Sequence, residues 1–75
     1  MAGKSKELVV CVKNDGYVVS LERRKLYVAL PDAKAAKRGQ LRIVDESGED
    51  FLYPQEFFLA IELPQSLRRR VLQAA

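Results

Sequence analysis

Residues 41–63 read LRIVDESGEDFLYPQEFFLAIEL, and this stretch indicates a small β domain. Residues 41–44, Leu-Arg-Ile-Val, predict a strand, and a polar turn at 45–50 leads into a returning strand at 51–53. Pro54 prevents that strand from continuing inside a sheet, because proline has no backbone N–H. Residues 57–63 alternate, which predicts Phe57 and Leu59 on the core face and Phe58 on the opposite face.

The same patterning continues toward the N-terminus. Residues 8–13 form an apolar run, Asn14-Asp15-Gly16 favours a tight hairpin turn, and residues 17–21 are rich in β-formers. Residues 26–30 alternate again. The strands expected are therefore 8–13, 17–21, 26–30, 41–45, 51–53 and 57–63. About five or six short antiparallel strands in so short a chain predict a small closed or half-closed barrel, because a flat sheet would leave an apolar face uncovered.

The segments between and around these strands complete the expected organisation. Residues 1–7 are polar and predict a disordered tail ahead of a barrel at 8–63. After Pro31, Asp32 caps a helical turn at 33–38, or these residues form a wide loop; the sequence fits both. Residues 64–75 predict a short helix, packed on the barrel or on a partner, in which an apolar stripe lies opposite three arginines. That stripe comprises Leu67, Val71 and Leu72.

Residues 48–58, GEDFLYPQEFF, resemble the end of an SH3 domain. In that family a glycine-bearing turn leads to a strand, a proline, a short 3₁₀ turn, an aromatic residue and a last strand. Pro54 matches the SH3 proline, and Phe57 matches the aromatic that closes the 3₁₀ turn. The resemblance implies an SH3-like barrel in which Pro54 and Phe57 would line a peptide groove. The alternation places Phe58 on the opposite face, where either the C-terminal helix covers it through Leu67 and Val71, or it belongs to a partner or oligomer surface. The expected protein-binding residues are therefore Tyr53, Pro54, Phe57 and Phe58. The chain has no tryptophan, so the resemblance implies the fold rather than polyproline binding.

Residues 45–54 also resemble a segment, D-E-S-G-E-D-[FY]-L-Y-P, of small bacterial proteins. That second resemblance implies a bacterial protein and carries no activity with it.

Composition argues against an enzyme. The sequence has no histidine and one cysteine, and its four glycines stand apart from one another. A Cys–His pair, a zinc ligand set and a glycine-rich phosphate loop are all excluded on those grounds, so we expect neither a catalytic site nor a cofactor. We expect Cys11 in the core as a small hydrophobe, and the four carboxylates of residues 45–50 on a solvated hairpin tip rather than around a cation.

Charge is segregated along the chain. Residues 1–40 contain nine Lys/Arg and four Asp/Glu, residues 41–63 contain one and six, and residues 64–75 add three arginines. If the connections 23–25 and 34–38 converged, they would form a basic patch able to bind nucleic acid. That patch would comprise Arg23, Arg24, Lys25, Lys34, Lys37 and Arg38. The acidic segment 41–63 would weaken the positive electrostatic potential of this patch. A nucleic-acid-binding barrel is therefore the alternative interpretation and not the main one.

No apolar run approaches membrane-spanning length, and the first residues do not resemble a signal peptide. We therefore expect a cytoplasmic, non-enzymatic protein-interaction module, whose partner is another protein or a second copy of the chain.

Overall fold

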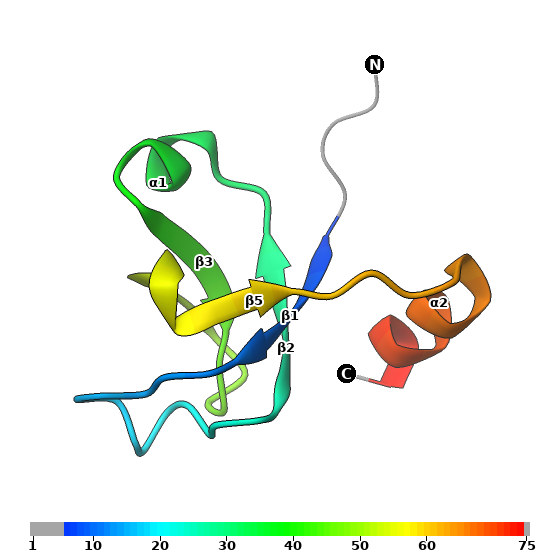
Figure 1. Cartoon of the computed structure of the whole chain (residues 1–75), viewed down its shortest axis with the longest axis horizontal. Helices are drawn as coiled ribbons and strands as arrows, with labels where there is room; N and C mark the ends of the chain where they lie inside the picture. Colours follow the sequence, from blue (N-terminus) through cyan, green and yellow to red (C-terminus); the bar gives the residue numbers. More distant parts are fainter. Residues whose placement is uncertain (1–5, 75) are drawn as a thin grey trace.

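The structure is a computed structural model that describes residues 6–74 (Figure 1). Its strands are β1 (Glu7–Cys11), β2 (Leu26–Leu30), β3 (Gln40–Val44), β4 (Asp50–Pro54) and β5 (Phe58–Ala60). Two helices, α1 (Ala33–Lys37) and α2 (Gln65–Ala74), and a 3₁₀ turn, η1 (Gln55–Phe57), complete the chain. Of the tail expected at 1–7, residues 1–5 lie outside the described part, and Glu7 belongs to β1.

The strands form one antiparallel sheet in the order β4-β3-β2-β1-β5, curled into a half-barrel. Strands β1 to β4 follow one another as a meander, and β5 returns to pair with β1, so the first and last strands along the sequence lie side by side (Figure 1). The prediction of a small, mostly β half-barrel with a short C-terminal helix is confirmed.

The predicted strand at 17–21 is wrong, and with it the predicted hairpin. Gly16 has φ 83°, as the turn requires, but the N–H groups of Ser20 and Leu21 then both bond to Tyr17 O. The chain curls into a second turn, and the Asn14 side-chain amide donates to Leu21 O at 3.0 Å. β1 pairs instead with β2. Val18 and Val19 favour a strand, but a strand needs a neighbouring strand to pair with, and no described strand is paired with these residues.

The segment after β2 resolves the choice between helix and loop. Asp32 Oδ1 accepts a hydrogen bond from Ala35 N at 2.9 Å and so caps the short helix α1. The Arg42 side chain on β3 bonds to Asp32 Oδ2 at 2.8 Å and to Asp50 Oδ1 at 2.9 Å. This ion-pair cluster ties α1 to β3 and to the start of β4. The hydrogen bond from Ala35 N, and after it the bond from Arg42, lowers the pKa of Asp32.

The core fills the concave side of the half-barrel with aromatic and aliphatic side chains. The buried cluster comprises Val9, Cys11, Leu21, Tyr27, Ala29, Ile43, Tyr53, Phe57 and Phe58. Cys11 is free and fully buried, as expected, and burial raises the pKa of its thiol.

The expectation that Phe58 faces outward is wrong. Phe57 is the last residue of η1 and Phe58 the first of β5, so the alternation expected across them is broken at this junction. Both rings lie in the core, and the Phe58 ring makes edge contacts with Tyr27 and Tyr53. The next residue, Leu59, which the alternation placed inside, is 59% exposed.

Helix α2 lies to the side of β1 and β2 (Figure 1), and Phe58 does not depend on it for cover, because that ring lies in the core. Leu8 is only 2% exposed although it is outside the core cluster, and it shares one surface hollow with Val71 and another with Arg68. The Arg68 guanidinium also donates to the backbone carbonyl of Lys6. The face that α2 covers is therefore the outer side of β1.

Leu21 lies in residues 12–25, the connection between β1 and β2, and provides a test of whether this connection belongs to the core. We expect Leu21→Ala to lower the free energy of unfolding by about 2–5 kcal/mol, because the side chain is 1% exposed and its loss leaves a cavity. Val19→Ala, at a position 92% exposed on the same connection, is the control and should change stability by less than about 0.5 kcal/mol. Urea unfolding measures both, and similar values for the two variants would contradict this account.

Candidate functional site

The structure places most of the predicted protein-binding residues inside the molecule. Tyr53, Phe57 and Phe58 are 3%, 6% and 6% exposed, and Pro54 is half-buried. They have little side-chain surface to offer a partner. Tyr17 lies over two of them, with its ring centroid 5.0 Å from that of Tyr53 and 6.0 Å from that of Phe57.

The predicted basic residues do not converge. Residues 23–25 directly precede β2 and residues 34–38 follow its far end, so the two groups lie at opposite ends of this strand (Figure 1). Lys25 Nζ also lies 2.6 Å from Glu46 Oε2, which partly neutralises it. The structure thus provides two separate basic connections instead of one patch.

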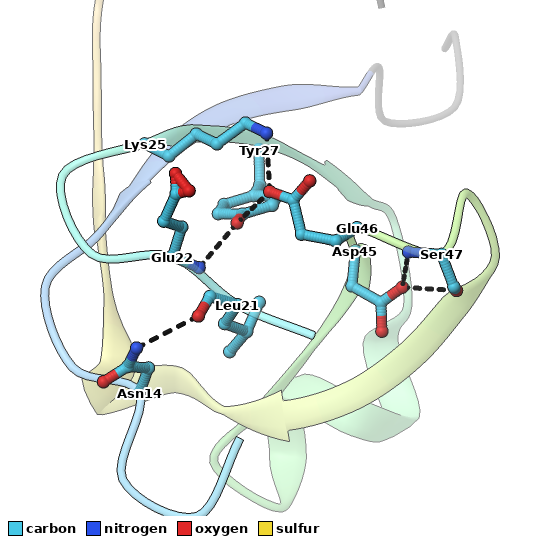
Figure 2. Close-up of polar contacts among 8 residues, drawn as sticks. All are labelled: Asn14, Leu21, Glu22, Lys25, Tyr27, Asp45, Glu46 and Ser47. Atoms are coloured by element: carbon cyan, nitrogen blue, oxygen red, sulfur yellow. Dashed lines mark hydrogen bonds and ion pairs between the residues drawn. The ribbon is translucent and has the colours of Figure 1, made fainter. Parts of the chain in front are cut away.

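Glu46, in the turn between β3 and β4, is the centre of a polar network that holds the connection 12–25 (Figure 2). Tyr27 OH donates to Glu46 Oε2 at 2.6 Å and accepts from Glu22 N at 2.7 Å. The hydrogen bonds from Lys25 and Tyr27 hold the pKa of Glu46 below its ordinary value. Burial, helped by the bond to Glu46, raises the pKa of the Tyr27 phenol, so this phenol remains protonated at neutral pH.

Asp45 forms a second link from the same turn. Its Oδ1 accepts from Ser47 N at 2.9 Å and Ser47 Oγ at 2.6 Å (Figure 2), and its Oδ2 accepts from Tyr53 OH at 2.6 Å. Tyr53 OH also lies 2.9 Å from Ser20 Oγ, and Glu46 N donates to Ser20 O at 3.1 Å. Burial opposes ionisation of Asp45, but these hydrogen bonds outweigh it and lower its pKa.

The four carboxylates of residues 45–50 are thus not a uniformly solvated tip. Asp45 is 6% exposed, Glu46 pairs with Lys25, and Asp50 pairs with Arg42. Glu49 is exposed and is in no ion pair with another described residue. Among residues 6–74, no three His, Cys, Asp or Glu side chains come together in a way that could hold a metal ion.

An apolar surface lies at the tip of the held connection. Val18 and Val19 are 72% and 92% exposed, and Tyr17 and Phe51 are 41% and 49% exposed. Tyr17 and Phe51 line a shallow hollow of about 510 Å³ that also contains Glu49 and Asp45. We call Tyr17, Val18, Val19 and Phe51 the loop-tip surface. Sequence reasoning missed it because Tyr17 and the valines were assigned to a strand, and no local signal distinguishes the two conformations.

Comparisons with protein-family models, with curated proteins and with solved structures find no match to this chain. The helices within residues 6–74 are too short or too polar to cross a membrane.

Asp45 gives a prediction with a pH dependence. We expect Asp45→Asn to cost about 1–3 kcal/mol at neutral pH, because an amide nitrogen at Oδ2 cannot accept the Tyr53 hydroxyl. The folded pKa of Asp45 is lower than its unfolded pKa, so the carboxylate stabilises the fold above about pH 4 and loses this effect as the pH falls through the folded value.

The difference in unfolding free energy between the unmodified protein and Asp45→Asn should therefore shrink below about pH 4. Glu49→Gln is the matched control, since it removes a charge from the same turn without touching these bonds. Chemical unfolding across the acid range measures the difference, and a gap that stays constant with pH would contradict the assigned role of the carboxylate.

Proposed function

We propose that this chain is a non-enzymatic protein-interaction module on an SH3-like barrel, and that it binds its partner through the loop-tip surface. The observation that carries the proposal is the exposure of Val18 and Val19, at 72% and 92%, on a connection fixed at both ends by hydrogen bonds. Val18 and Val19 directly follow Tyr17, whose ring lines a hollow together with Phe51. Single exposed aliphatic residues are common, but a group of exposed apolar side chains such as this is typical of a contact site.

The fixed backbone of residues 12–25 matters for binding. Turn bonds to Tyr17 O, the Asn14–Leu21 bond and the Tyr27–Glu22 bond hold the connection before any partner arrives. A partner then binds without ordering this loop, and avoiding that cost strengthens association. Tyr17 supplies an aromatic anchor whose position is set by its contacts with Tyr53 and Phe57.

The chemistry of the surface indicates the kind of partner. Apolar side chains occupy its centre, and the exposed carboxylate of Glu49 lies at the edge of the same hollow as Phe51. A protein segment with apolar side chains next to a lysine or arginine complements this arrangement. The apolar contact supplies affinity and the rim charge supplies selectivity.

The SH3-like assignment rests on topology. The strand order β4-β3-β2-β1-β5, with η1 between β4 and β5, is compatible with that barrel, and Pro54 and Phe57 stand where the sequence resemblance expects them. The alternative, nucleic-acid binding, loses support because residues 23–25 and 34–38 lie at opposite ends of β2. A continuous positive surface is what phosphate binding requires.

The test compares three forms of the full chain as baits in quantitative affinity capture from bacterial lysate: unmodified, Val18→Ser/Val19→Ser, and Lys34→Ser/Lys37→Ser. We expect a set of proteins retained by the unmodified and lysine-substituted baits and lost from the valine-substituted bait. Calorimetry with the purified partner should then show affinity reduced at least about tenfold by the valine substitutions, because they remove apolar contact area. The melting temperature should stay nearly unchanged, since both positions are exposed.

Two results would contradict this function. One is capture that is identical for all three baits. The other is micromolar binding to single-stranded oligonucleotides that weakens steeply with salt and is lost on replacing Arg23, Arg24, Lys37 and Arg38 with serine.

A further inference from the structure

Strand β4 lies at one end of the sheet, and among the described strands it pairs only with β3. Backbone bonds just beyond its two ends show which way its peptide groups point. Gln55 N donates to Gly39 O at 2.9 Å. At the other end, Asp45 N donates to Glu49 O at 3.1 Å. Both pairs continue the register of β3 with β4, and along such a ladder bonded residue pairs alternate with pairs that are not bonded to each other.

This alternation decides which backbone groups of β4 remain for a partner. Phe51 and Tyr53 fall on the bonded positions and pair with β3. The N–H and C=O groups of Asp50 and Leu52 therefore point away from the sheet, and within residues 6–74 no backbone hydrogen bond reaches them. Pro54 falls on the same outward set, as expected of a residue without an N–H. We call the outward groups of Asp50, Leu52 and Pro54 the β4 edge.

A hollow of about 510 Å³ lies along the β4 edge. Phe51, Leu52 and Tyr53 all line it, although neighbouring side chains of a strand point to opposite faces of the sheet. The edge of the strand is the place that adjoins all three residues. Tyr17 and Ser20 of the connection 12–25 also line this hollow, so the β4 edge adjoins the loop-tip surface.

A partner that covers this hollow has to satisfy the backbone of Leu52. If it contacted side chains alone, it would exclude water and leave the Leu52 N–H and C=O without hydrogen bonds, which is costly. An extended segment laid along β4 bonds to both groups, and its alternate side chains then lie on the face that Phe51 and Tyr53 share.

The charge of the hollow indicates one side chain of that segment. Glu49 lines the hollow, is exposed and is in no ion pair with another described residue. Asp45 also lines it, but its carboxylate is already bonded to Ser47 and Tyr53. A lysine or arginine of the segment therefore complements Glu49.

The β4 edge is poorly suited to pair with the same edge of a second copy. In a two-fold pairing centred on Leu52, Asp50 of each copy lies opposite Pro54 of the other. Pro54 has no N–H to donate to the Asp50 carbonyl, so one bond is lost at each end. Proline and charged residues at a sheet edge are typical features that prevent self-pairing.

We propose that the partner of the loop-tip surface is a protein segment held as an added strand on the β4 edge, with backbone bonds to Asp50 and Leu52 and a basic side chain beside Glu49. The inference rests on the proposed function, because it describes how the partner at that surface is held.

The test uses the full chain and a synthetic peptide capped at both ends, Thr-Lys-Thr-Val-Thr-Val-Thr-Lys-Thr. Its valines and lysines share one face, and a lysine near each end suits either strand direction. We expect a dissociation constant below about 1 mM by NMR titration. The amide protons of Asp50 and Leu52 should gain protection from exchange, whereas those of Phe51 and Tyr53, already bonded to β3, should change little. Absence of binding at that concentration would overturn the proposal.

Two N-methylated peptides separate backbone pairing from side-chain contact. One carries N-methyl groups on the valines and lysines, and the other carries them on the inner threonines, so each loses the donors of one edge. A bound strand uses one edge, so one peptide should bind at least about tenfold more weakly than the other. Equal binding of the two would overturn strand addition.

Variants of the protein test the assigned groups. Leu52→Pro removes the outward N–H, and Leu52→Ala removes the same side chain but keeps the N–H. We expect Leu52→Pro to weaken peptide binding at least about tenfold more than Leu52→Ala. If Leu52→Pro does not fold, the methylated peptides still decide the question with the unmodified protein. Glutamate in place of both peptide lysines should weaken binding, and Glu49→Gln should remove that preference.

The two proposals fail by different results. Identical capture by the three baits would remove the loop-tip surface as the binding site, whereas equal binding of the two methylated peptides would remove only the added strand. If exchange protection of Asp50 and Leu52 rises with protein concentration in the absence of peptide, the edge pairs with a second copy, and the choice of partner is overturned.

Discussion

Two phenol–carboxylate hydrogen bonds hold the architecture together. Tyr27 donates to Glu46 and Tyr53 donates to Asp45, each at 2.6 Å, and both carboxylates belong to the turn between β3 and β4. The same phenol oxygens meet Glu22 N and the Ser20 hydroxyl, so each tyrosine joins the turn to the connection 12–25. A phenol or a carboxylate that is buried without a hydrogen-bond partner is costly, and the three buried groups, Tyr27, Tyr53 and Asp45, each have such a partner here. Without this linkage, residues 12–25 would be a long loop, and Leu21 would have no fixed place in the core.

Fixing that connection has a consequence for the core of so small a domain. β5 contributes only three residues, and η1 interrupts the alternation just before it. The strand alternation alone would place too few apolar side chains in the core. Leu21 in the connection 12–25 adds one, and Phe57 and Phe58 both point inward. The core is therefore assembled from turns as well as from strands. In a chain this short, the regular elements alone bury too little apolar area.

The sequence predicts the elements that have a simple period and misses those decided by a distant partner. Strands 26–30, 41–45 and 51–53 alternate and are bounded by turn residues, and the structure has strands at these places. Val18 and Val19 favour a strand just as strongly, but β1 finds its partner in β2, and nothing local reveals this. The faces predicted for residues 57–63 are wrong because the 3₁₀ turn η1 ends at Phe57 and shifts the alternation by one residue. Phe58 therefore lies in the core and Leu59 is exposed, the reverse of the prediction. Of the four residues predicted to bind a partner, Tyr53 and Phe57 lie beneath Tyr17 and support the candidate site rather than forming its surface.

The loop-tip surface takes its support from the core beneath it. Tyr17 rests on the buried rings of Tyr53 and Phe57, and those rings are fixed by β4 and by η1. The Tyr53 hydroxyl is in turn bonded to Asp45 and lies 2.9 Å from Ser20 Oγ, three residues beyond Tyr17. A partner that binds at this surface therefore meets a ring whose position is already set, and the cost of ordering it has been met by folding.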